Sequence, residues 1–148
     1  MIGCGVRGRT AHMQGIYKHL AATNFEIVAL ADPWRIHREQ ANGMVKEWFG
    51  REAKLFTSYR DLLAMDGIDA VMIASPDFHH TTHLEAAANE SPHEPDPWER
   101  LALAHHHRDD WQRSLEFAEK AIAAPISTHA TDPLSKARAA ELASIALW

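Results

Sequence analysis

Three glycines, Gly3, Gly5 and Gly8, stand within six residues near the start of the chain, directly before a stretch with helical periodicity. In a connection from a strand to a helix, the first glycine permits a tight turn and the second permits close approach of a bound pyrophosphate. The third glycine lets the helix pack closely on the strand. The positive N-terminal end of that helix then faces the anion. Because this spacing also arises by chance, its meaning depends on the residues that come after it in the chain.

The glycines are followed by a short apolar run over residues 25–31 that ends at Asp32. Such a run is typical of a strand that is buried on both faces of a parallel sheet. Asp32 lies 24 positions after Gly8, close to the spacing of the acid that hydrogen-bonds the ribose of a dinucleotide. A carboxylate there favours NAD over NADP, because it repels a 2′-phosphate. Arg35 and Arg38 leave an alternative open, in which one of them binds a 2′-phosphate.

The first part of the chain alternates short β-type runs with amphipathic stretches. We expect helices over residues 9–22, 33–49 and 59–64, with strands over residues 25–31, 54–56 and 70–74. This order predicts an α/β fold, a partial Rossmann-type parallel sheet with flanking helices and right-handed crossovers. Gly50 is the expected C-terminal stop of the second helix.

Four motifs, in the right order, are similar to the nucleotide-binding domain of one family. They are the turn from Ile2 to Gly8, the strand end Ala31-Asp32-Pro33, Tyr59-Arg60-Asp61-Leu62-Leu63, and Ile68-Asp69-Ala70-Val71 followed by Ile73-Ala74-Ser75-Pro76-Asp77 and His80. Over residues 1–88 the chain resembles the glucose-fructose oxidoreductase, inositol dehydrogenase and rhizopine-catabolism (Gfo/Idh/MocA) family.

The resemblance implies an NAD(P)-binding oxidoreductase-like protein of the sugar or polyol dehydrogenase type. The cofactor contacts that it implies come from Gly3, Gly5, Val6, Arg7, Gly8, Asp32, Ser75, Pro76 and His80. Ser75, Pro76 and His80 would lie near the nicotinamide end. For His80, a capping or surface role is the alternative.

The chain also departs from the family pattern. Only Met1 and Ile2 precede Gly3, which leaves a short central strand, and the Glu-Lys-Pro motif with the family's catalytic lysine does not occur. No residues correspond to the family's substrate domain. We therefore assign no catalytic residue and expect a truncated oxidoreductase-like protein that retains cofactor contacts.

The rest of the chain has a different character. After a domain over residues 1–90, residues 91–97 form a proline-rich junction, and residues 98–148 predict an all-α tail of about three helices, including 110–124 and 133–148. The tail resembles a tetratricopeptide repeat at Trp98, Leu101, Ala102, His105, Ser114, Ala118, Ala121 and Pro125. An alanine-rich helical hairpin is the alternative. A single repeat cannot bury its own apolar face, so we expect self-association or a protein partner, with packing on the first part of the same chain as the alternative.

Composition limits the remaining possibilities. The formal net charge of −5 argues against nucleic acid, and no apolar run reaches membrane-spanning length. The single cysteine, Cys4, fits a reducing cytoplasm, where we expect the protein. The consecutive histidines at 105–107 cannot converge on one ion from a single helix face. His79 and His83 are better spaced, four residues apart, but no supporting acid of the metalloprotease type lies between them, so no metal is expected. Two other functions stay open, an interaction module that acts through the tail, and a fused or fragmentary reading frame without catalytic function.

Overall fold

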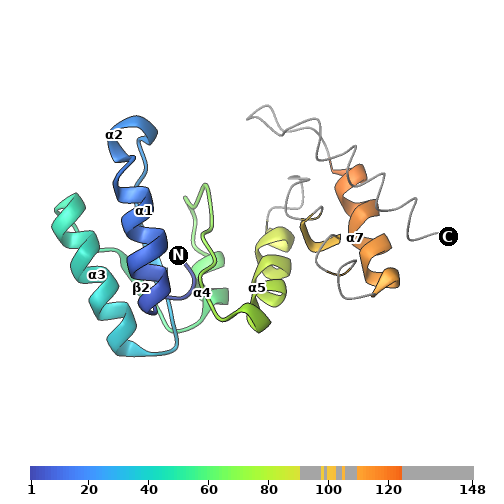
Figure 1. Ribbon diagram of the computed structural model, residues 1–148, viewed down its shortest axis with the longest axis horizontal. Helices are drawn as coiled ribbons and strands as arrows, with labels where there is room; N and C mark the ends of the chain where they lie inside the picture. Colours follow the sequence, from blue (N-terminus) through green and yellow to red (C-terminus); the bar gives the residue numbers. More distant parts are fainter. Residues whose placement is uncertain (91–97, 99, 103–104, 106–109, 125–148) are drawn as a thin grey trace. The chain divides into compact units, whose positions relative to one another are not determined.

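The structure is a computed structural model that describes residues 1–90, 98, 100–102, 105 and 110–124 (Figure 1). The chain divides into two compact units, Met1–His83 and Leu84–Trp148, with the boundary inside helix α5 (Asp77–Glu90). The predicted junction over residues 91–97 and the predicted helix over residues 133–148 lie outside the described residues. Within the described part of the chain, no helix is both long and apolar enough to cross a membrane.

The first unit is built on a parallel sheet. Strand β1 (Ala29–Ala31) pairs in parallel with β2 (Lys54–Phe56), and Ile2 forms parallel bridges to Ala31 on one side and Ile73 on the other. The order across the sheet is therefore β2, β1, Ile2, Ile73. The amide N–H of Ile2 donates to the Met72 carbonyl at 2.9 Å, and the amide of Ala74 donates to the Ile2 carbonyl at 2.8 Å. This arrangement confirms the predicted α/β fold with a partial Rossmann sheet.

The strands are shorter than predicted. Only residues 29–31 of the expected strand over 25–31 are extended into a ladder, and the expected strand over 70–74 is reduced to a bridge at Ile73. The physical reason lies in the central segment, which turns away at Gly3 with a φ of 88°. Because only Ile2 pairs with both neighbours, those neighbours have few ladder positions to fill.

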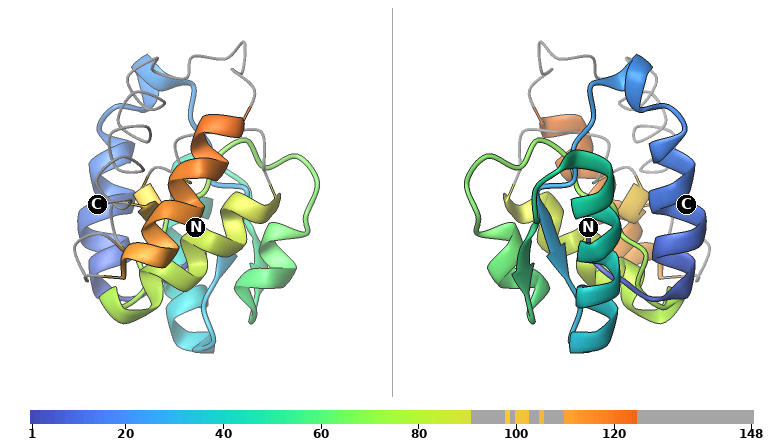
Figure 2. Two further views of the ribbon diagram at one scale, coloured as in Figure 1. Left: turned by 90° about the vertical axis from the view of Figure 1, so that its right-hand side faces the viewer. Right: turned by 90° about the vertical axis from the view of Figure 1, so that its left-hand side faces the viewer.

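Both faces of β1 are covered, as expected for a parallel strand. Leu30 packs with Met13 and with Val45 of helix α3 (Arg35–Phe49). Ala29 and Ala31 point to the opposite face, because side chains alternate along a strand. They pack with Leu62 of helix α4 (Tyr59–Leu63), so that β1 lies between α3 and α4 (Figure 2, right).

Helix ends follow the local chemistry. Gly50 takes a left-handed φ of 70° and ends α3, as predicted, and the Ser58 hydroxyl caps α4 by accepting from the Arg60 amide at 3.1 Å. The expected single helix over residues 9–22 is wrong. The chain instead forms a π-helical stretch η1 (Gly8–Met13), then α1 (Gln14–Tyr17) and α2 (Leu20–Thr23). The break follows from a tighter turn, in which the His19 amide donates to the Ile16 carbonyl at 2.8 Å.

The second unit has its own helical core. Residues 98, 100–102 and 105 are helical, and α7 (Trp111–Ala123) begins at Asp110, whose carboxylate accepts from the Arg113 amide at 3.4 Å. The core of this unit comprises Ala88, Trp98, Leu101, Ala102, Phe117, Ala118, Ala121 and Ala124. The Ser114 hydroxyl is fully buried and donates to the Ala102 carbonyl at 3.0 Å, which ties α7 to the preceding helical residues.

Candidate functional site

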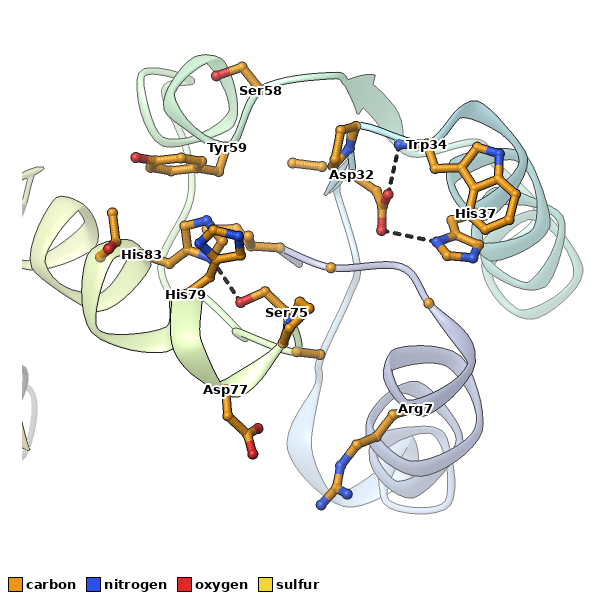
Figure 3. A pocket seen from close by; sticks show the side chains of 18 of the residues that line it. Arg7, Asp32, Trp34, His37, Ser58, Tyr59, Ser75, Asp77, His79 and His83 are labelled. Carbon is orange, nitrogen blue, oxygen red and sulfur yellow. Dashed lines mark hydrogen bonds and ion pairs between the residues drawn. The ribbon is translucent and has the colours of Figure 1, made fainter. Parts of the chain in front are cut away.

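A cavity of about 910 Å³ opens in the first unit (Figure 3). This volume lies in the upper part of the roughly 300–1,000 Å³ range of small-molecule sites. Its lining comes from the glycine turn, the end of β1, residues 57–59 after β2, and the segment from Ala74 to His83. It thus collects the residues that follow the carboxyl end of each parallel segment.

The sheet order explains why a cavity forms here. From Ile2, the chain passes to β1 and β2 on one side, and the Ile73 segment then pairs on the other side of Ile2. The connections therefore diverge between Ile2 and Ile73, which is a topological switch point. In open α/β sheets, ligands bind in the crevice beyond the carboxyl ends of the strands at such a point.

The three glycines have different surroundings. Gly3 has a positive φ, and a Cβ added there would lie 2.5 Å from the Ser75 backbone nitrogen. A Cβ on Gly8 would lie 2.5 Å from the Gly3 carbonyl oxygen, so Gly8 is needed for close packing of η1. A Cβ on Gly5 would meet only the His37 ring, at 3.6 Å, which is ordinary contact. Gly3 and Gly5 line the cavity, together with Val6 and Arg7, whereas Gly8 does not.

Asp32 joins three parts of the site. Its side chain is buried, with one carboxylate oxygen accepting from the Cys4 amide and the other from the Trp34 amide, each at 2.8 Å. His37 Nδ1 lies 3.4 Å from the oxygen that Cys4 contacts. Because a carboxylate offers about four acceptor positions, Asp32 keeps acceptor capacity for a ligand in the cavity that it lines.

The arginines near this end of the cavity are engaged with other groups. Arg38 donates to the backbone carbonyl of Asp32, and Arg35 forms an exposed ion pair with Glu39 at 2.8 Å. Neither of them lines the cavity, whereas Arg7 does. Figure 3 shows the Arg7 side chain extending away from Asp32.

The opposite end of the cavity carries a hydrogen-bonded serine and histidine. Ser75 Oγ lies 2.8 Å from His83 Nδ1, and the His83 ring packs against Tyr59 at 4.3 Å between centroids. Burial lowers the pKa of His83, and the neighbouring His79 and His80 lower it further. Pro76 also lines the cavity. His80 does not line it; its Nε2 lies 2.6 Å from the Ser75 carbonyl oxygen.

Sequence reasoning did not assign several side chains that line the cavity, among them Trp34, His37, Tyr59, His79 and His83. His79 and His83 are four residues apart on α5, so helical spacing was a usable signal that they share a face. Trp34 directly precedes α3, and His37 follows it by three residues. His37 therefore lies about one helical turn further along, on the same side as Trp34.

Cys4 has no exposed surface and packs in the core beside the turn. Burial, together with the nearby charge of Asp32, raises the pKa of its thiol to about 12, which keeps it protonated and unreactive. In the part of the chain that the structure describes, no three His, Cys, Asp or Glu side chains are grouped so that they would hold a metal ion.

Comparison with known proteins agrees with this geometry. The model of a family described as an oxidoreductase family with an NAD-binding Rossmann fold matches residues 1–93. No curated protein and no solved structure matches the chain. The family match covers the whole cavity lining and more than half of the 148 residues.

Proposed function

Because the chain belongs to this oxidoreductase family with an NAD-binding Rossmann fold, we propose that it binds NAD in the cavity beside the glycine turn. The observation that carries the proposal is the position of Gly5. Gly5 lines the cavity, and a Cβ added there would meet only the His37 ring, another lining residue, at 3.6 Å. The backbone at Gly5 is therefore open to close approach by a pyrophosphate.

The proposed cofactor spans the cavity from Asp32 to Ser75. The pyrophosphate lies over the backbone of Gly3, Gly5 and Val6 at the positive end of η1, where Arg7 adds a cation. Gly8 supports this turn from behind by allowing η1 to pack closely. The adenosine ribose donates hydrogen bonds to the Asp32 carboxylate.

The nicotinamide half then falls on the other side of the turn. This position is required because the pyrophosphate is central in the molecule and the adenosine half is placed at Asp32. Figure 3 shows that the residues there are Ser75, His79, His83 and Tyr59. Pro76 contributes an apolar contact, and His80 orients the loop through the Ser75 carbonyl.

We propose NAD and not NADP as the preferred cofactor near neutral pH. A 2′-phosphate on the adenosine ribose would lie beside the Asp32 carboxylate, and the two negative charges would repel each other. Arg35 and Arg38, the alternative partners for that phosphate, contact Glu39 and the Asp32 backbone instead.

Isothermal titration of the full chain with NAD and with NADP tests the proposal. Asp32→Ala should weaken NAD binding far more than NADP binding. Circular dichroism should verify that the variant folds, because the Cys4 and Trp34 amides lose their acceptor. Glu39→Ala is the matched control, since that exposed carboxylate pairs with Arg35 outside the cavity. Unchanged NAD affinity in folded Asp32→Ala would remove Asp32 from the site.

When bound, NAD supplies hydride-transfer chemistry, but we assign no catalytic residue to this chain. The family's Glu-Lys-Pro motif is absent from the sequence, so its lysine has no counterpart here. The proposed role is therefore cofactor binding of the oxidoreductase type.

A second proposed function concerns the helical unit. The described residues at tetratricopeptide-type positions, namely Trp98, Leu101, Ala102, His105, Ser114, Ala118 and Ala121, are all buried. This pattern supports a repeat-like helical pair. We propose that the pair self-associates, because tetratricopeptide-type repeats usually need neighbouring repeats to cover their apolar faces. Sedimentation of the full chain over a range of concentrations should show an increasing mass. A constant monomer mass at all concentrations would contradict this proposal.

A further inference from the structure

The side chain that faces the Asp32 carboxylate from α3 is a histidine. His37 Nδ1 lies 3.4 Å from an Asp32 oxygen, and the His37 ring packs against Trp34 at 4.3 Å between centroids. Asp32, Trp34 and His37 all line the cavity, and they lie together at one side of it in Figure 3. The His37 side chain is 23 % exposed, so it is accessible from the cavity while its ring is held in place.

The charges around His37 leave Asp32 as its electrostatic partner. On the same helix, Arg38 donates to the Asp32 carbonyl, and on η1, Arg9 donates to the Cys4 carbonyl. The Cys4 thiol is uncharged, because its pKa is raised. Among the described residues, the Asp32 carboxylate is thus the charged group in direct contact with the His37 ring.

We propose that His37 determines how the cavity selects between NAD and NADP, and that its protonation admits the 2′-phosphate. This inference rests on the proposed NAD site. With a neutral imidazole, the Asp32 charge stands alone and excludes a 2′-phosphate. With an imidazolium, the Asp32 charge is balanced, and the ring offers a cationic N–H beside the ribose 2′ position.

An imidazole changes its charge between about pH 5 and 8, a range in which carboxylates and guanidinium groups keep theirs. A hydrogen bond to a charged group is typically worth more than one between neutral groups. NADP binding should therefore strengthen relative to NAD binding as the pH falls, on the order of tenfold between pH 8 and pH 5.5.

The experiment is isothermal titration of the full chain with NAD and with NADP at several pH values from 5.5 to 8. The quantity compared is the ratio of the two association constants in the natural chain and in His37→Gln. This control is needed because a 2′-phosphate itself takes up a proton near pH 6. Whatever the phosphate contributes persists in His37→Gln, so only the difference between the two proteins reports on His37.

His37→Arg provides a second variant with a permanent cation. It should bind NADP more tightly than the natural chain at pH 8. The ratio of its NADP and NAD association constants should change with pH no more than the same ratio in His37→Gln. If the natural chain and His37→Gln show the same pH dependence, or if His37→Arg leaves the ratio at pH 8 unchanged, His37 does not set the choice. If neither cofactor binds to the natural chain at any pH, the proposed function itself is wrong, and the inference is rejected with it.

Discussion

Replacing Gly5 with alanine should separate cofactor binding from folding. The added methyl group would meet protein only at the His37 ring, 3.6 Å away, which is an ordinary van der Waals contact. Since Gly5 is not among the residues with a positive φ, alanine fits its backbone and should raise the free energy of unfolding by about 0.4–1 kcal/mol. The same methyl group would project into the cavity at the proposed pyrophosphate position.

The effect on binding follows from that intrusion. Adding a methyl group to a filled site typically costs about 1–3 kcal/mol, which corresponds to roughly 5- to 150-fold weaker NAD binding. Calorimetric titration measures the affinity, and urea unfolding followed by circular dichroism measures the stability. Full NAD affinity in a folded Gly5→Ala variant would refute the argument, because the cofactor would then not approach this backbone.

Two other glycines calibrate the result. Gly3→Ala should lower the free energy of unfolding by about 2–5 kcal/mol, since a left-handed φ costs about 1–2 kcal/mol and the clash at 2.5 Å adds a further 1–3 kcal/mol. Gly43→Ala on α3 has nothing within 4 Å and should stabilise the chain by about 0.5–1 kcal/mol without changing NAD affinity. Loss of folding in Gly5→Ala would contradict the open surroundings of this glycine.

Two further predictions concern groups with shifted pKa values. Because the pKa of Cys4 is raised from 9.0 to about 12, its thiol should resist iodoacetamide in the folded chain at pH 8 and react once urea unfolds it. Since the unfolded thiol loses its proton first, the free energy of unfolding should fall as the pH rises from 9 towards 12. Because the pKa of His83 is lowered, the unfolded state takes up its proton more readily, and stability should fall as the pH drops through 6.5. Urea unfolding at pH 7.5 and 5.5 should show a smaller acid-induced loss in His83→Gln, and an equal loss in both proteins would contradict this reasoning.

The sequence predicted the parts of the fold that depend on local chemistry. The glycine turn before a helix, the apolar strand that ends at Asp32, and the helix that stops at Gly50 were all visible as short patterns. The parallel order of the segments followed from the alternation of strand-like and helical stretches. The reason is that each of these features is set by backbone conformation or by the period of the apolar residues.

Other features depend on contacts that the sequence does not display. The lengths of the strands depend on how many partners Ile2 offers, which only the folded sheet defines. The contact of His37 with Asp32 depends on the direction in which α3 leaves β1. Likewise, the hydrogen bond from Arg38 to the Asp32 backbone carbonyl depends on the folded position of its side chain, which the sequence does not display.

Nuclear magnetic resonance of the ¹⁵N-labelled chain during titration with NAD tests cofactor binding at the glycine turn most directly, because it reports on each backbone amide separately. We expect saturable shifts at Gly3, Gly5, Val6 and Ser75, which line the cavity, and little change at Ala121 in the core of the helical unit. No shift at millimolar NAD, or shifts that avoid the glycine turn, would contradict NAD binding in this cavity.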